Sequence, residues 1–186
     1  KDISLASFYA IKTGEKAVII DNNDDKKNFK NFKEKLELDF SKTRDYEFNT
    51  NLIKNGLINK LLIYGPNNSG KSNLGAAIMD ISTHLTENQN DNILYNYYIN
   101  GDAIDEVVSF DYEFLFGTQN VHYSYIKDAQ RKLISEKIYE NDNLIFEYNY
   151  STNKFQNKIP EAKTLDISKR NTEIPALKFI FNNTLY

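Results

Sequence analysis

The chain contains no cysteine and no tryptophan, and it has only three prolines and seven glycines in 186 residues. Without cysteine it can form neither a disulfide framework nor a thiolate metal site. It also lacks an apolar run near the roughly 18 residues that a membrane-spanning helix needs, and nothing resembles a signal peptide. We therefore expect no membrane contact and a cytoplasmic location.

An excess of charge of one sign is missing as well. The chain carries 26 acidic and 23 basic residues, and its formal net charge of −3 argues against a large sequence-independent nucleic-acid surface. The basic residues between positions 26 and 35 follow Asp24 and Asp25 and are interrupted by Glu34, a pattern typical of a solvated edge. Binding of nucleic acid at a local patch stays open as an alternative.

The length of the chain and its first residue indicate how many domains to expect. With 186 residues the chain suits one domain with a real core, or a large piece of a bigger one. Because it begins with Lys1 rather than methionine, we expect a piece of a larger protein. The abundance of Asn, Lys, Ile and Tyr is typical of an AT-rich bacterial or phage genome.

A strand, a glycine-containing loop and a helix are predicted in direct succession near the middle of the chain. Leu61–Tyr64 is a continuous apolar run, typical of a central strand covered on both faces. From Lys71 to about Leu85, apolar residues recur at helical spacing and predict one buried stripe. The stripe consists of Leu74, Ile78, Ile81 and Leu85.

Other segments show strand periodicity or the marks of turns. Upstream, short strands are expected at 7–11, 17–20 and within 29–40, and a polar connection at 41–57. Downstream, alternation of aromatic and polar residues predicts an antiparallel meander. Its expected parts are a strand with Phe110, Tyr112, Phe114 and Phe116 on one face, a loop at 117–120, a strand with Val121, Tyr123 and Tyr125, and a hairpin of 133–139 with 144–150. A short helix near 174–181, with Pro175 near its first turn, should follow.

The loop between the predicted strand and helix matches the P-loop pattern G-x-x-x-x-G-K-[ST] at every fixed position. Its glycines allow backbone conformations in which successive N–H groups surround a phosphate, and the helix N-terminus adds further donors. Lys71 would contact the β- and γ-phosphates of ATP as the catalytic cation, and the Ser72 hydroxyl would ligate Mg2+. The predicted cofactor-binding residues are Gly65, Pro66, Asn67, Asn68, Ser69, Gly70, Lys71, Ser72 and Asn73.

Leu62–Leu74 resembles the Walker A segment of ABC-type ATPase heads. Within these it is closest to the branch of SMC-like and overcoming-lysogenization-defect (OLD) proteins, because Asn73-Leu74 follows the serine. Lys30–Lys33 resembles the N-F-[RK] strand that opens such heads. Asn68 departs from the glycine common in ABC transporters, which disfavours a transporter.

The resemblance is tight over residues 61–75 and loose over 27–150. It implies an α/β fold, the N-terminal lobe of an ABC-type P-loop ATPase head with an antiparallel β-subdomain. We therefore expect one partial head over 1–186, with P-loop core strands and helix at 27–85, the β-subdomain at 93–150, and the start of a further, helical part at 151–186.

Function follows from the same resemblance. Such heads bind ATP and hydrolyse it once a complete site has formed, they associate with a second copy through the head, and in bacterial anti-phage systems they control a nuclease or toxin effector. Two alternatives are an SMC or DNA-repair ATPase head, which would need coiled-coil heptads that the sequence lacks, and a nucleotide-sensing scaffold that does not hydrolyse ATP.

Two further parts of an ABC-type site are not recognisable in the sequence. No Ser-Gly-Gly signature motif occurs. Residues 17–21 resemble a Walker B strand ending in Asp21, but they precede the P-loop, and Asn22 stands where the catalytic glutamate would be. A short buried strand that ends in a turn explains them equally well.

The remaining polar candidates favour structural roles. His84 and His122 have no companion at metal-ligand spacing, so a structural or surface role is the simpler interpretation. Asp80 is expected on the solvated face of the helix, and Lys71 is expected to face solvent without ligand. Tyrosines at 95–98, 123 and 125 could stack on bases, but the packed face of a sheet uses the same residues.

Overall fold

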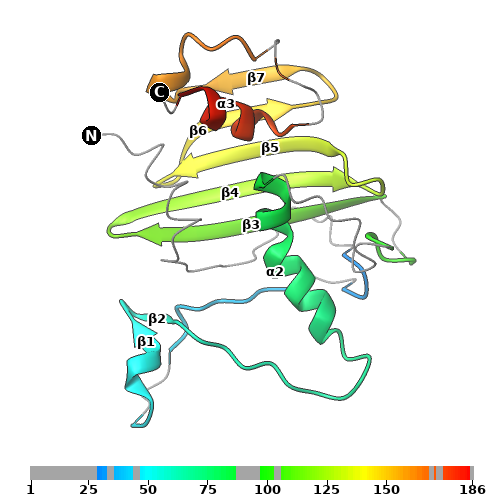
Figure 1. Ribbon diagram of the computed structural model, residues 1–186, viewed down its shortest axis with the longest axis vertical. Helices are drawn as coiled ribbons and strands as arrows, with labels where there is room; N and C mark the ends of the chain where they lie inside the picture. Colours follow the sequence, from blue (N-terminus) through cyan, green and yellow to red (C-terminus); the bar gives the residue numbers. More distant parts are fainter. Residues whose placement is uncertain are drawn as a thin grey trace.

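The computed structural model has a mixed α/β fold, in which two helices lie on one face of a five-stranded antiparallel sheet (Figure 1). The sheet comprises β3 (Val107–Phe116), β4 (Gln119–Asp128), β5 (Leu133–Glu140), β6 (Asn143–Asn149) and β7 (Lys154–Asn157), paired in chain order. Among the described residues, the two helices on this face are α2 (Lys71–Leu85) and α3 (Ala176–Thr184). The structure describes residues 29–32, 36–43, 47–86, 97–102, 106–167, 170 and 174–184.

The predicted meander is confirmed, with turns tighter than expected. Only Gly117 and Thr118 separate β3 from β4, and Gly117 has a positive φ of 62° that suits the turn. Asn141 and Asp142 connect β5 to β6 with φ of 44° and 66°, the conformation of a two-residue hairpin turn. The short fifth strand, β7, has little apolar alternation and was not predicted.

One face of the sheet forms the core. The aromatic residues of β3 point to this face, and successive rings from Phe110 to Phe116 stack with centroids 5.9 to 6.4 Å apart. Tyr123 and Tyr125 of β4 lie on the same face and are almost fully buried. The packing interpretation of these tyrosines is therefore confirmed, whereas Tyr97 is exposed.

The predicted helix α2 is confirmed at both ends, but its buried face differs from the predicted stripe. Asp80 is 1% exposed and His84 is also buried, whereas Leu74, Ile78 and Leu85 are only half-buried. The expectation that Asp80 faces solvent is wrong, because the tyrosines and a lysine of the sheet supply hydrogen-bond donors that a hydrophobicity pattern does not reveal.

Helix α3 is attached to the same face of the sheet through Glu136 of β5. This fully buried carboxylate accepts hydrogen bonds from the backbone N–H groups of Ala176 and Leu177, at 2.7 and 3.2 Å. Burial raises the pKa of Glu136. A carboxylate at these N–H groups satisfies donors that the helix itself cannot use. Pro175 immediately precedes α3, as the sequence predicted.

The apolar run Leu61–Tyr64 forms no strand, which contradicts the prediction of a buried central strand. Leu62 and Tyr64 are 85% and 88% exposed, and the run has irregular structure. A central strand needs a neighbour on each side, and every strand in the described part of the chain pairs elsewhere. The described residues 36–40 are also irregular rather than extended in a strand.

The predicted polar connection at 41–57 contains structure instead. A 3-10 turn, η1 (Thr50–Leu52), leads into a small hairpin of β1 (Ile53–Lys54) and β2 (Leu57–Ile58). Asn55 and Gly56 form its turn with positive φ of 53° and 76°. Asn-Gly is a strong hairpin signal, so the sequence did carry this information. A second 3-10 turn, η3 (Pro160–Ala162), follows β7.

Several expectations concern residues outside the described part of the chain. These are the strands at 7–11 and 17–20, the Walker B-like Asp21 and its neighbour Asn22, the lysines at 26 and 27, and Tyr95. Within the described ranges, no helix combines the length and apolar character required to cross a membrane.

His84 makes the stability of the fold sensitive to mild acid. Its ring stacks on Tyr125 with centroids 4.2 Å apart, and burial, with the nearby charge of Lys127 as a smaller cause, holds its pKa well below 6.5. Below about pH 6.5 the imidazole of His84 therefore binds a proton in the unfolded chain but stays neutral in the folded chain. We predict that this residue lowers the free energy of unfolding between pH 7 and 5.5 by up to roughly 1 kcal/mol, the limit that the unfolded pKa of histidine sets.

Urea unfolding at both pH values, on the wild type and on His84→Phe, measures this contribution. Phenylalanine keeps the ring stack but cannot be protonated, so the fall between the two pH values should be smaller by that amount. Equal pH dependence in the two proteins would contradict a buried neutral histidine.

Candidate functional site

The predicted P-loop lies where α2 begins, beyond the edge of the sheet (Figure 1). Gly70 precedes the helix with φ of 89°, a left-handed conformation that glycine adopts without strain. Asn68 also has a positive φ, 64°, and asparagine tolerates this region better than most residues. Asparagine can therefore occupy the position at which ABC transporters commonly have glycine.

The first glycine of the motif serves a different purpose from the one predicted. Gly65 does not have a positive φ. A Cβ added to it would lie 3.1 Å from the Ser69 hydroxyl, which is closer than ordinary packing allows. What Gly65 provides is the close approach of the two ends of the loop.

Lys71 is half-buried, and it bridges the loop through contacts that the sequence did not predict. Its ammonium donates to the carbonyl oxygens of Gly65 and Pro66, at 2.8 and 2.6 Å, and is 3.4 Å from the Ser69 hydroxyl. The loop itself is exposed. Lys71 therefore ties the start of the loop to the first residue of α2, and the same charge stands beside any ligand bound at the loop.

The first turn of α2 offers hydrogen-bond donors to an anion. The helix begins with no side-chain cap and with no acidic residue in its first turn. The Leu74 N–H bonds to the Gly70 carbonyl at 2.8 Å, but no partner within the described residues is present for the N–H groups of residues 71–73. Such N–H groups, together with the helix dipole, favour a phosphate.

Two side chains near this turn have different surroundings. The Ser72 side chain is exposed at the second position of the helix, where it could reach a metal ion bound to phosphate. The Asn73 side-chain amide donates to the Asn31 side chain at 2.7 Å. Asn73 thus fixes the segment around Asn31 to the helix, a contact between residues 42 positions apart that spacing alone could not reveal.

The other histidine lies on the opposite face of the sheet, away from α2. His122 is 2.9 Å from the Asp111 carboxylate and stacks on Tyr139. Nearby, Lys137 pairs with Glu147. Within the described ranges, no three His, Cys, Asp or Glu side chains gather as metal ligands. The His122–Asp111 and Lys137–Glu147 contacts join neighbouring strands across this face.

Comparison with protein families places this geometry in context. A family whose description reads "AAA domain, putative AbiEii toxin, Type IV TA system" matches residues 60–182, about two thirds of the chain. The chain belongs to this family. It is an AAA-type, P-loop ATPase-like domain, for which nucleotide binding, typically with Mg2+, is the implied chemistry. The matched span of this AAA domain contains the loop, α2 and the whole sheet. No curated protein and no solved structure matches the chain.

The loop geometry predicts that Gly70 cannot be replaced without loss of stability. A Cβ there would lie 2.5 Å from the Asn31 side-chain nitrogen, and the positive φ adds strain of about 1–2 kcal/mol. Gly70→Ala should therefore lower the free energy of unfolding by about that amount, mainly through the backbone strain, as measured by urea titration.

Gly75 provides a matched control in the same helix. A Cβ added there meets nothing within 4 Å, and alanine is the better helix former. Gly75→Ala should raise stability by roughly 0.5–1 kcal/mol. Equal effects of the two substitutions would mean that the backbone at Gly70 does not have the conformation described.

Proposed function

We propose that this AAA domain binds ATP with Mg2+ through residues 65–73, and that its nucleotide state controls a nuclease or toxin effector in anti-phage defence. The observation that carries the nucleotide part is the uncapped first turn of α2 beside the Lys71 ammonium. N–H groups without partners and a full positive charge next to them are what a triphosphate requires.

The residues of the loop divide the work of binding. Backbone N–H groups at the start of α2 hold phosphate oxygens, and Lys71 neutralises the charge of the terminal phosphates. Because Lys71 now bonds to two loop carbonyls, phosphate must draw the ammonium toward itself and release the loop. Binding of ATP therefore rearranges the loop as well as filling it.

Ser72 fits the role of a magnesium ligand. Its hydroxyl is exposed next to the phosphate-binding turn, and a hydroxyl oxygen is a ligand that Mg2+ accepts alongside phosphate oxygens and water. When bound, Mg2+ would neutralise charge on the β- and γ-phosphates. Ser72 itself would orient the ion relative to Lys71.

Two observations support the effector and assembly parts of the proposal. The family description names a toxin and a type IV toxin–antitoxin system, which suits a partner in defence. Large apolar side chains at Leu61, Leu62, Tyr64 and Met79 are exposed close to the loop in sequence or on α2. Exposed large apolar side chains are frequent at protein contacts, so association of two copies through this end of the domain is the assembly that we propose.

The nucleotide part is tested by Lys71→Ala. Removal of a charge-assisted contact worth about 1.5–3 kcal/mol should weaken ATP binding roughly tenfold or more. Titration of the full chain with a fluorescent ATP analogue gives the affinity. Lys154→Ala, an exposed lysine on β7 at the other end of the molecule, is the matched control and should bind as the wild type does.

The same pair of variants tests the biological part. In cells that carry the complete system, Lys71→Ala should abolish protection against phage, and Lys154→Ala should preserve it. If Lys71→Ala loses nucleotide binding but still protects the cells, defence does not depend on ATP binding at this loop. Equal affinities of Lys71→Ala and wild type would refute the nucleotide site itself.

Ser72→Ala should weaken binding of Mg-ATP more than binding of metal-free ATP, because only the first uses the hydroxyl as a ligand. Calorimetry in Mg2+ and in EDTA yields both affinities. A loss of the same size under both conditions would show that Ser72 shapes the loop and does not hold the metal.

A further inference from the structure

Helix α2 is attached to the sheet from its second turn onward. Its buried residues are Ala76, Ala77, Asp80, Ile81 and His84, and its first turn contributes none. Figure 1 shows the helix crossing the β3–β4 side of the sheet and projecting beyond it toward the P-loop. The orientation of the phosphate-binding end therefore depends on contacts more than one turn away.

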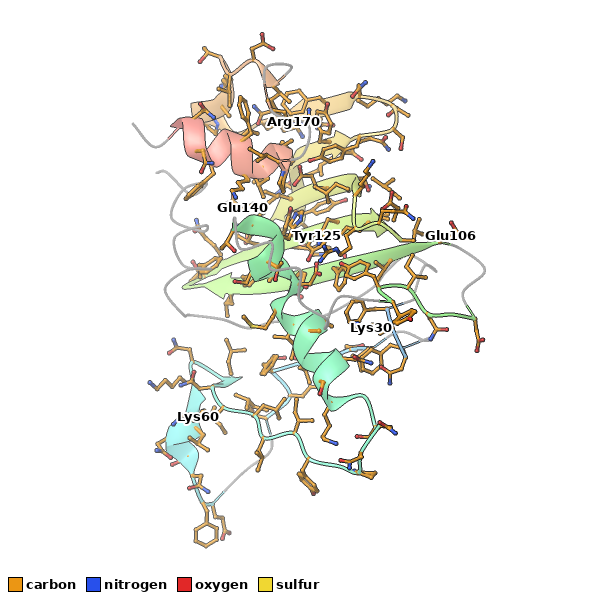
Figure 2. The ribbon with its side chains drawn as sticks, turned by 45° about the vertical axis from the view of Figure 1, so that its right-hand side comes forward. Lys30, Lys60, Glu106, Tyr125, Glu140 and Arg170 are labelled. Atoms are coloured by element: carbon orange, nitrogen blue, oxygen red, sulfur yellow. The ribbon has the colours of Figure 1, made fainter. Side chains whose placement is uncertain are left out.

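Asp80 makes the strongest of these contacts. One carboxylate oxygen accepts from the Tyr98 hydroxyl at 2.8 Å, and the other accepts from the Tyr125 hydroxyl and the Lys127 ammonium, each at 2.7 Å. Figure 2 labels Tyr125 where α2 crosses the sheet. Charge-assisted hydrogen bonds are the strong ones, and here all four groups are buried.

These donors restrain rotation of α2 about its own axis. Tyr125 and Lys127 belong to β4, whereas Tyr98 comes from the segment that precedes β3. Tyr112 of β3 adds a bond to the Ala77 carbonyl at 2.8 Å, on the same side of the helix. Rotation of α2 would break bonds to several parts of the fold and leave a buried carboxylate and a buried ammonium unpaired, which is costly.

Small rotations of α2 matter at the P-loop. Groups at the helix surface lie about 5 Å from the axis. A rotation of about 15° would move the Ser72 hydroxyl by roughly 1.3 Å, and misplacement by about 1 Å is enough to disrupt a reacting or metal-binding geometry. The restraint at Asp80 therefore acts on Ser72 and Lys71, although Asp80 touches neither.

We propose that Asp80 is a positioning residue for the nucleotide site, which fixes the rotation of α2 so that Lys71 and Ser72 meet the phosphates and Mg2+ together. The inference rests on the proposed function, because it assumes that the loop binds Mg-ATP. A purely structural Asp80 would stabilise the fold without any specific effect on nucleotide affinity.

Asp80→Asn is the test, since it keeps the shape of the side chain and removes its charge. In the full chain, under conditions where circular dichroism shows the variant folded, affinity for Mg-ATP should fall at least fivefold. The ratio of affinities with Mg2+ and with EDTA should also shrink, because Ser72 is displaced. Tyr125→Phe, which removes one bond to Asp80 and keeps the ring, should show the same effects at smaller size and serves if Asp80→Asn does not fold.

Glu136→Gln is the matched control, because Glu136 is equally buried on the same face of the sheet but holds α3. It should lower stability without changing nucleotide affinity. An unchanged affinity in Asp80→Asn, or in Tyr125→Phe where that variant is used, would overturn the inference. So would an equal loss in Glu136→Gln, since affinity would then follow overall stability.

Lys71→Ala distinguishes failure of the inference from failure of the function. If Lys71→Ala weakens binding and Asp80→Asn does not, only the positioning role is wrong. If Lys71→Ala binds as the wild type does, the nucleotide site is wrong and the positioning role fails with it.

Discussion

The buried carboxylate of Asp80 is the constraint on which the arrangement of helix and sheet depends. An unpaired carboxylate would be expelled from the core, so its presence requires donors from the sheet at fixed places. Tyr125 and Lys127 of β4 supply two of them, and burial lowers the pKa of Lys127 even though the carboxylate opposes that shift. A buried ion pair adds little net stability compared with apolar packing, but breaking it is costly. The Asp80–Lys127 pair therefore favours one orientation of α2 on the sheet over slightly rotated or shifted orientations, which would break it.

The same logic extends across the sheet and explains why tyrosine is so frequent in the core. The Tyr123 hydroxyl lies 2.7 Å from the His84 ring nitrogen and donates to Glu136 at 2.8 Å, so it joins the end of α2 to the residue that caps α3. Burial raises the pKa of Tyr123 and Tyr125, which keeps both hydroxyls protonated as donors. Aromatic rings fill the core, and their hydroxyls attach the helices.

Sequence patterns predicted most of the local structure, with the hairpin at Asn55-Gly56 and strand β7 as exceptions, and missed the contacts between distant residues. The helix at 71–85 and both hairpins follow from periodicity and turn residues within a few positions of each other. The burial of Asp80 depends on partners 18, 45 and 47 residues away. The pattern of the helix alone does not contain these partners, and a charged residue was therefore predicted to face solvent. The P-loop residues were recognisable because they follow one another directly in the sequence, so the motif contains the whole loop. The prediction of a strand at Leu61–Tyr64 was wrong because an apolar run suggests a buried strand but does not show which strand it would pair with.

The two sides of the P-loop are held very differently, and this bears on what nucleotide can do. On one side, α2 is fixed through buried bonds to the sheet. On the other side, the exposed residues 61–69 are tied to the helix mainly through Lys71, whose bonds to the carbonyls of Gly65 and Pro66 are solvent-exposed and therefore weak. A phosphate that captures the Lys71 ammonium competes with those bonds directly. Nucleotide would then leave α2 in place and change the loop and the exposed apolar run before it. Ligand binding at such a loop can alter a protein contact nearby, because the ligand and the contact share the same weakly held segment.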